Sequence, residues 1–217
     1  AFAHITDVRD AAALEALAEA AFAQHGQVDL LFNNAGVLST GLSWEIPAEI
    51  WQASLDINIG GIVNGLRAFV PRLLAADRPA RIINTASVGG FLPSPFMAPY
   101  SATKFAVVAL TESLAGELAA LGSQISVSLL APGPVKTQIF REKPTAAAQP
   151  FHAAMTGLLG EHGMTADDFA ALVFAGIDRG DYWIIPQPEA LDPALEDRHA
   201  HIMGRRPPQF YSTGDAS

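Results

Sequence analysis

Short apolar runs alternate with long helical patterns along most of this chain, and this alternation is the feature that most limits its fold. Residues 28–32, 81–85, 125–130 and 182–185 are largely apolar on both faces, as strands are when helices cover both sides of a sheet. Helical patterns separate these runs, so consecutive strands need crossover connections and must run parallel. The sequence therefore predicts an α/β fold built on a parallel sheet.

The helical patterns cover residues 9–24, 47–76, 98–121 and 165–178, and a further helix is expected to end near Met203. Asp10 and Thr165 are suited to cap helix N-termini, and Gly26 is suited to end the first helix. Asn58 opens an Asn-Ile-Gly-Gly sequence that predicts a break in the second helix. Periodicity is weak over about 138–164, where prolines and glycines predict a mobile lid.

The length of 217 residues is sufficient for one α/β domain, and 50% of the residues are hydrophobic, which is enough for one core. We expect residues 1–186 to form this domain, with the variable lid at about 138–164. Residues 187–217 are expected to add a C-terminal helix and tail to the same domain.

Composition also restricts the partners. The net charge is −9, from 22 acidic against 13 basic residues, and this disfavours binding to nucleic acid. No uncharged apolar run approaches the roughly 18 residues of a membrane span, so we expect a cytoplasmic protein without a membrane partner. The chain has no cysteine, and its six histidines lack zinc-like spacing with carboxylates, so no metal is expected.

Tyr100 and Lys104 are four residues apart, so a helix places both side chains on one face. A lysine cation near a phenol stabilises the phenolate. The pair therefore predicts a lowered pKa for Tyr100 and a role as general acid or base. By itself this spacing is common on surface helices.

Two further polar residues lie where ligands bind in α/β proteins. Ser87 follows the strand at 81–85, at the carboxyl edge of the expected sheet, where a hydroxyl can hold a carbonyl oxygen. Asn58 lies at the helix break, where its amide could hold a water or an exposed carbonyl. Each also has a structural interpretation, Ser87 as a helix cap and Asn58 as a helix-break residue.

Asn58, Ser87, Tyr100 and Lys104 occur in this order, with Asn-Asn-Ala-Gly at 33–36 before them and Pro-Gly-Pro-Val-Lys-Thr at 132–137 after them. This set resembles the short-chain dehydrogenase/reductase family, closely over residues 1 to about 140 and loosely over 165–186. The resemblance implies a Rossmann-like doubly wound parallel sheet. It also implies an oxidoreductase that interconverts an alcohol and a ketone by hydride transfer with NAD or NADP.

The resemblance assigns a role to each of the four catalytic residues. Tyr100 would give a proton to the substrate oxygen or take one from it, and Ser87 would polarise that oxygen. Lys104 would bind the nicotinamide ribose and lower the pKa of the tyrosine. Asn58 would hold a water in a proton relay.

The resemblance also assigns cofactor contacts to three segments. The end of the expected third strand would meet the adenine ring, and the turn after residues 28–32 would line the adenosine ribose. The proline-glycine turn would pack on the nicotinamide. Together with the tyrosine-lysine pair, the assigned residues are Asp7, Val8, Asn34, Ala35, Gly36, Tyr100, Lys104, Pro132, Gly133, Pro134, Val135 and Thr137.

One part of the family pattern is missing. Among the 18 glycines no two are separated by a single residue, which excludes a GxGxxG phosphate turn. A doubly wound sheet would then lack its first βαβ segment, and the strand at 28–32 would have an unpaired edge. We therefore expect a chain that is truncated at its N-terminus relative to the family pattern and compatible with both NAD and NADP.

Two alternatives to an active oxidoreductase stay open. One is a non-catalytic remnant or binding module that keeps the fold but cannot hold a dinucleotide, because the glycine-rich turn is missing. The other is a cofactor-independent lyase similar to the halohydrin dehalogenases. Those enzymes use arginine in place of the lysine, so Lys104 argues against this alternative.

The kind of substrate and the oligomeric state are predicted from the family resemblance and from apolar residues in loops. The helices at 47–76 and 98–121 are the usual dimer faces in the family, which implies a homodimer or homotetramer. Apolar side chains in the loops flanking the expected pocket predict an apolar or cyclic small-molecule alcohol or ketone. These side chains are Phe91, Phe96, Met97, Ile139, Phe140, Phe151, Met155, Leu158 and Leu159.

Overall fold

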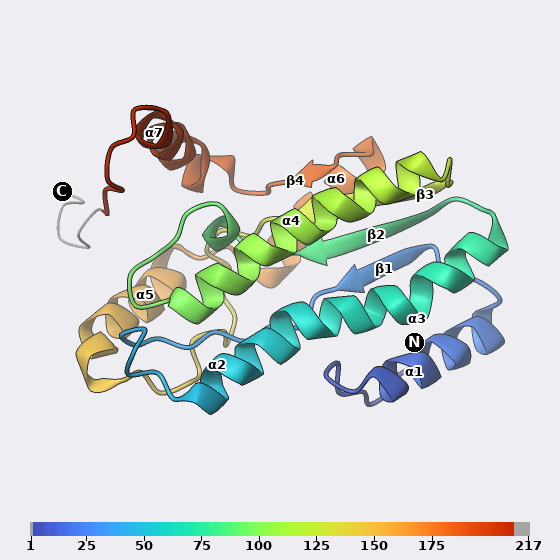
Figure 1. Ribbon diagram of the computed structural model, residues 1–217, viewed down its shortest axis with the longest axis horizontal. Helices are drawn as coiled ribbons and strands as arrows, with labels where there is room; N and C mark the ends of the chain where they lie inside the picture. Colours follow the sequence, from blue (N-terminus) through green and yellow to red (C-terminus); the bar gives the residue numbers. More distant parts are fainter. Residues whose placement is uncertain (1, 211–217) are drawn as a thin grey trace.

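A four-stranded parallel sheet forms the centre of the computed structural model, which describes residues 2–210. The strands are β1 (Leu30–Asn33), β2 (Ala80–Thr85), β3 (Ile125–Leu130) and β4 (Trp183–Ile184), and they lie in the sheet in this order (Figure 1). Each pair is parallel, with Ile82 of β2 beside Val127 of β3. The predicted α/β parallel fold is confirmed.

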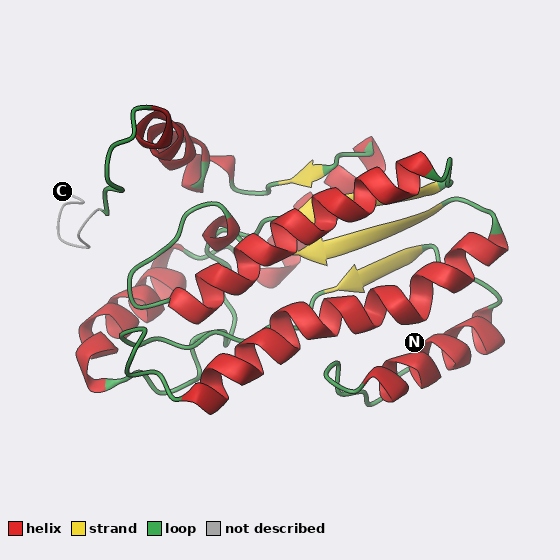
Figure 2. Ribbon diagram, in the orientation of Figure 1, coloured by secondary structure: helices red, strands yellow, loops and turns green. Residues whose placement is uncertain are grey.

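Helices cover both faces of this sheet (Figure 2). α3 and α4 pack on one face with α1 against α3, while α6 packs on the other face. α5 lies near the carboxyl ends of the strands, and α7 lies beyond β4 (Figure 1). The helices are α1 (Ala11–His25), α2 (Ala48–Leu55), α3 (Gly61–Ala76), α4 (Ala98–Ala120), α5 (Gln149–His162), α6 (Ala166–Arg179) and α7 (Asp192–Met203).

Helix ends follow the expected local chemistry. The Asp10 side chain accepts hydrogen bonds from the first amides of α1, and Gly26 ends that helix in the left-handed conformation with φ of 73°. Thr165 accepts from the Asp168 amide and caps α6. The expected break near Asn58 is a π-helical segment, Asp56–Gly60, between α2 and α3.

The core has one part on each face of the sheet. Ile82 is buried with α1, α3 and α4, and its neighbour Ile83 is buried with Val173 of α6. Alternate residues of a strand point to opposite faces, which explains the continuous apolar pattern of β2. By length and composition alone Ala48–Ala76 could cross a membrane, but its α3 part places Phe69 in this core, and this packing explains the apolar pattern without a membrane.

β1 forms one edge of the sheet, and within residues 2–210 no strand pairs with its outer side. The unpaired edge expected from the sequence is therefore confirmed. Leu30 and Phe32 are 38% and 37% exposed, and on the α6 side the Phe32 ring is covered by Phe174 at a centroid distance of 6.1 Å. Residues 2–9, where the end of a third strand was expected, contain no strand.

Part of the expected lid is regular structure. Residues 149–162 form α5, a helix that was not predicted there. Phe151, Met155, Leu158 and Leu159 recur in it at helical spacing, but Gly157 and Gly160, which disfavour a helix, also lie within it. The predicted C-terminal helix is α7, and Arg198 on it lies 5.2 Å from the centre of the Phe105 ring of α4.

Buried amides and a hydroxyl connect β1, β2 and α4. Asn33 Nδ2 donates to Asn84 Oδ1 at 2.8 Å, and Asn84 Nδ2 donates to Thr111 Oγ1 at 3.1 Å. α3 packs directly over this network at Gly65, where a Cβ would lie 2.5 Å from Asn33 Oδ1. Gly65 is therefore needed for a close helix–strand approach.

Gly65→Ala is expected to lower the free energy of unfolding by about 1–3 kcal/mol, because the added methyl group displaces the hydrogen-bonded Asn33 amide. Chemical denaturation measures the change. Gly116→Ala is the control, because Gly116 is exposed on α4 with no atom within 4 Å of its added Cβ. This control should raise stability by about 0.5–1 kcal/mol through helix propensity. Equal effects of the two substitutions would contradict the close approach.

Candidate active site

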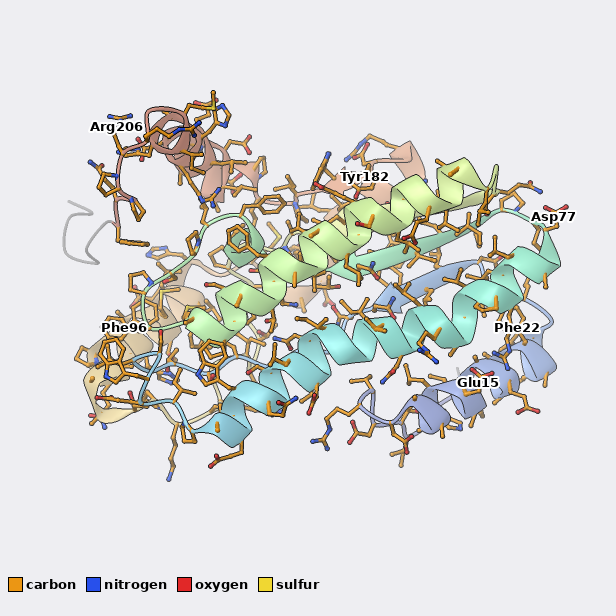
Figure 3. The ribbon with its side chains drawn as sticks, viewed as in Figure 1. Glu15, Phe22, Asp77, Phe96, Tyr182 and Arg206 are labelled. Carbon is orange, nitrogen blue, oxygen red and sulfur yellow. The ribbon has the colours of Figure 1, made fainter. Side chains whose placement is uncertain are left out.

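The strands all point toward one end of the molecule, so the loops after them meet there. Phe96 lies at this end beside α5, and Asp77 lies at the opposite end (Figure 3). Ligands bind at the carboxyl edge of open parallel sheets because the loops there are free to form a site. Three of the four predicted catalytic residues, Ser87, Tyr100 and Lys104, follow β2 or lie in the first turns of α4.

Ser87 and Tyr100 lie next to each other. A Cβ on Gly89 would be 3.2 Å from Tyr100 Cε1 and 3.5 Å from Ser87 Oγ, so this glycine backbone fits between the two side chains. Ser87 also caps a short 3₁₀ turn, because its Oγ accepts from the Gly89 amide at 3.1 Å. Ser87 therefore caps a helical turn, as its structural interpretation predicts, and also lies beside the Tyr100 phenol.

Lys104 lies one turn after Tyr100 on α4 and is only 3% exposed. Its Nζ donates to the Thr85 carbonyl oxygen at 2.7 Å and lies 5.7 Å from the centre of the Tyr100 ring. The predicted arrangement of Tyr100 and Lys104 on one helix face is confirmed. The ammonium also lies close to Gly36, where a Cβ would be 3.6 Å away.

Burial dominates the pKa values of both groups. It raises the pKa of Tyr100, and a hydrogen bond with the Ser87 hydroxyl opposes this rise. Burial lowers the pKa of Lys104 to about 8. The prediction of a lowered pKa for Tyr100 is therefore wrong for this structure, because desolvation of the phenolate outweighs the effect of a cation on the same helix face.

Asn58 is fully buried in the π-helical segment, and its amide contacts two other segments. Oδ1 accepts from the Val37 amide at 2.8 Å, and Nδ2 donates to the Val37 carbonyl at 3.0 Å. Nδ2 also donates to Thr103 Oγ1 at 2.9 Å. The side chain thus joins α4 to the turn after β1, so α4, the π-helical segment and this turn meet at one residue.

The turn after β1 is also bound to β2. Asn34 Oδ1 accepts from Thr85 Oγ1 at 3.1 Å, while the Thr85 carbonyl holds Lys104. The turn that was expected to line a ribose therefore lies beside the buried ammonium. Gly36 lies in this turn, and a Cβ there would be in van der Waals contact with Asn58 Oδ1 at 3.4 Å.

Gln187, in the loop after β4, is a residue that sequence reasoning missed. It is 6% exposed, and its Nε2 donates to the Pro134 carbonyl at 2.9 Å. A Cβ on Gly133 would lie 2.9 Å from Gln187 Oε1, so the amide packs directly on the proline-glycine turn. Within residues 2–210 this Oε1 has no hydrogen-bond partner. Only the pairing of β3 with β4 brings the two loops together, so no local sequence signal could have indicated the contact.

The other residues of the proline-glycine turn have different surroundings. Val135 forms an isolated parallel bridge with Met164, where the lid segment ends, and the Met164 amide donates to the Pro134 carbonyl at 3.0 Å. Thr137 is exposed. The turn therefore touches both the lid segment and the loop after β4.

Asp7 and Val8 lie near the start of α3. Asp7 forms an ion pair with Arg9 at 2.6 Å, which lowers the pKa of this exposed carboxyl group to about 2. Val8 packs on Gly61, where a Cβ would be 2.8 Å from Val8 Cγ2, and its carbonyl accepts from Asn64 Nδ2 at 3.0 Å.

Aromatic residues join α5 to the rest of the site. Phe96 has a positive φ of 62°, unusual for a bulky residue, and its ring lies 5.5 Å from that of Phe151 on α5. His152 Nδ1 is 3.0 Å from Thr40 Oγ1, and the His152 ring stacks edge-on with Phe140 at 5.6 Å. Some of the apolar residues predicted for the pocket thus contact one another.

Two surface hollows, of about 230 and 570 Å³, are lined by residues of α6, β4 and α7 and by none of the four predicted catalytic residues.

Two observations test whether a nicotinamide dinucleotide fits. Lys104 Nζ makes one hydrogen bond within residues 2–210, which leaves two of its three N–H donors for ribose hydroxyls. The unpaired Gln187 Oε1 is a buried acceptor beside the proline-glycine turn. Both features fit the nicotinamide-ribose half of such a cofactor. The glycines of this chain provide no GxGxxG turn for the phosphate half.

Residues 1–148 match the family model for short chain dehydrogenase. The chain belongs to the short-chain dehydrogenase family. It is 30% identical over 211 residues to a CLA biosynthesis dehydrogenase/reductase of Lactiplantibacillus plantarum, covering 91% of this chain and 73% of that protein. It is also 35% identical over 186 residues to a 1-deoxy-11-beta-hydroxypentalenate dehydrogenase of Streptomyces exfoliatus, covering 85% of this chain and 64% of that protein.

Solved structures of short-chain dehydrogenases have the same fold. A short-chain dehydrogenase/reductase from Burkholderia phymatum in complex with NAD aligns with a TM-score of 0.90 at 35% identity, covering 95% of this chain and 78% of that one. A metagenomic short-chain oxidoreductase in complex with NADP aligns with a TM-score of 0.56 at 37% identity, covering 62% and 60%. The expected Rossmann-like fold is confirmed.

The buried Lys104 predicts a pH-dependent stability. Because burial lowers its pKa from 10.5 to about 8, the folded protein binds this proton less tightly than the unfolded chain does. The free energy of unfolding should therefore rise with pH above about 8, until the unfolded lysine also loses its proton. Lys104→Met removes this gain. We expect the stability of the variant relative to the parent to fall by about 1–2 kcal/mol between about pH 7 and 9.5.

Chemical denaturation at several pH values measures this trend. Lys143→Met is the control, because Lys143 is exposed, and its stability relative to the parent should stay constant over the same range. The same trend in both variants, or no trend in either, would contradict the buried position of the Lys104 charge.

Proposed function

We propose that this chain is an NAD(P)-dependent oxidoreductase that interconverts an alcohol and a ketone by hydride transfer, with Tyr100 as general acid or base. The observation that supports it most is the contact of Tyr100 with Ser87, one helical turn from the buried Lys104 ammonium. A hydroxyl, a phenol and a cation at the carboxyl edge of a parallel sheet suit a reaction in which an oxygen atom gains or loses a proton.

In ketone reduction, the Ser87 hydroxyl would donate a hydrogen bond to the carbonyl oxygen, and Tyr100 would give that oxygen its proton. The dinucleotide, when bound, supplies the hydride for reduction or accepts it in the reverse reaction. Burial raises the pKa of Tyr100, so the phenol carries its proton at neutral pH. The Lys104 charge would stabilise the phenolate that remains.

The relatives support this proposal. Those named above include dehydrogenases, and the two solved structures hold NAD in one case and NADP in the other. We propose NAD or NADP for this chain, held at its nicotinamide end by Lys104 and the 132–137 segment. The Asn34–Gly36 turn is proposed to line the adenosine ribose. Asp7 and Val8 are proposed to meet the adenine.

The substrate and the assembly are proposed on narrower grounds. A small apolar or cyclic alcohol or ketone suits the apolar rings of Phe96 and Phe151 near α5. Residues 138–164 are proposed to cover it as a lid of the single domain, because Met164 bonds to Pro134 and His152 bonds to Thr40. From family resemblance we propose a cytoplasmic homodimer or homotetramer, which sedimentation analysis can check.

The glycine spacing favours a second candidate function. Since no two glycines are separated by a single residue, the chain could be a non-catalytic binding module that keeps the fold without holding a dinucleotide. The two candidates differ in cofactor binding. Titration with NADH and NADPH, followed by the fluorescence of Trp44, Trp51 and Trp183, separates them. Saturable binding supports the oxidoreductase, and no binding by the folded protein supports the binding module.

Tyr100→Phe is expected to reduce kcat for ketone reduction by roughly 10²–10⁴-fold, because it removes the general acid. Tyr182→Phe is the matched control, because it also removes a phenolic hydroxyl. The Tyr182 hydroxyl lies beside β4 and has no hydrogen-bond partner among the described residues. The control should keep kcat within about twofold of the parent. NAD(P)H oxidation with a panel of ketones measures both variants, and equal rates for the two would exclude Tyr100 as the acid.

A further inference from the structure

Thr103 lies on α4 between Tyr100 and Lys104, and its hydroxyl is buried with an exposed fraction of 0%. Oγ1 donates to the Tyr100 carbonyl at 2.9 Å and accepts from Asn58 Nδ2 at 2.9 Å. Its single proton is therefore committed to its own helix, so toward Asn58 it can only accept. The Thr103 hydroxyl thus acts as donor toward Tyr100 and as acceptor toward Asn58.

This polarity matches the orientation of the Asn58 amide. Nδ2 faces the Thr103 hydroxyl, and Oδ1 faces the Val37 amide, which can only donate, at 2.8 Å. The Val37 carbonyl accepts the second Nδ2 hydrogen at 3.0 Å. Both amide hydrogens and the amide oxygen thus have partners in a fully buried position, where an unmatched group would be costly.

The segment held in this way is part of the site. Gly36 precedes Val37 and lies between two polar atoms, since a Cβ there would be 3.4 Å from Asn58 Oδ1 and 3.6 Å from Lys104 Nζ. The distance between this turn and the ammonium is therefore determined through Asn58. Thr103 is the α4 residue to which Asn58 is bonded, so it controls that distance from the helix that carries Tyr100 and Lys104.

We propose that Thr103 is a positioning residue, whose hydroxyl anchors Asn58 to α4 and thereby holds the Gly36–Val37 turn against the helix that carries Tyr100 and Lys104. The expected effect of Thr103 on turnover rests on the proposed function, whereas its expected effect on the Gly36–Val37 turn is independent of that function. Small displacements of groups around a reacting centre reduce turnover strongly, so loss of the hydroxyl should lower kcat more than it raises KM.

Two pairs of variants isolate the hydroxyl. Thr103→Val keeps the branched shape and removes the oxygen, while Thr103→Ser keeps the oxygen and removes the methyl group. Thr103→Ser and Thr103→Ala differ from each other only in the hydroxyl. This second pair makes the same comparison if the valine variant does not fold.

The first measurement is amide hydrogen exchange by NMR on the full chain. In the valine and alanine variants we expect the Val37 amide to exchange about 10-fold faster or more, because its acceptor Asn58 Oδ1 is no longer held. In the serine variant it should exchange within about twofold of the parent rate. The Val127 amide in the central β2–β3 ladder should keep its rate in all variants, which separates a local effect from general destabilisation.

The second measurement is the division between kcat and KM in NAD(P)H-linked ketone reduction. We expect kcat to fall about 10-fold or more in the valine and alanine variants, with KM within about threefold, and the serine variant to restore kcat. Equal effects of alanine and serine on Val37 exchange would overturn the proposal, because the methyl group rather than the hydroxyl would then matter. Altered exchange with unchanged kcat would also overturn it. If no variant or parent turns over a ketone, the proposed function fails, and the exchange result still decides whether Thr103 holds the turn.

Discussion

The hydrogen bond from Lys104 to the Thr85 carbonyl is the interaction on which the arrangement of the site depends. It ties the first turns of α4 to the carboxyl end of β2 at 2.7 Å, in a position with almost no exposure to solvent. A buried ammonium is costly, and the lowered pKa of about 8 expresses this cost. The rest of the fold must supply the packing that compensates for it. The benefit is a cation fixed beside Tyr100, where a phenolate would form.

Further hydrogen bonds join the residues around Lys104 and Thr85 to the turn after β1. Thr85 bonds to Asn34, and Asn58 bonds to Val37, so both ends of the turn after β1 are fixed from inside the protein. Asn33 and Asn84 bond to each other beneath them. Asn58 and Asn84 are fully buried, whereas Asn34 is exposed. These hydrogen bonds hold the turn beside the ammonium, although it is a loop.

The edge of β1 that faces away from β2 is less well covered than the edge that pairs with β2. This outer edge has no strand partner within residues 2–210, and Phe32 is 37% exposed beside Phe174 of α6. Lys104, which is proposed to hold the nicotinamide end of a dinucleotide, is buried, whereas no GxGxxG turn for phosphate occurs in the sequence. The chain spans 73% of the length of one dehydrogenase relative and 64% of another.

The sequence by itself determined the order of strands and helices, the caps at Asp10, Gly26 and Thr165, the break at Asn58 and the identity of the tyrosine and lysine. These features depend on local patterns and on spacing along one helix, which a sequence contains directly. Only the tertiary structure decided the raised pKa of Tyr100, the bond from Asn58 to Thr103, the contact of Gln187 with Gly133 and the close approach at Gly65. Each of these depends on burial or on distances between segments far apart in the chain. α5 was also missed, because Gly157 and Gly160 within it disfavour a helix and outweighed the helical spacing of Phe151, Met155, Leu158 and Leu159.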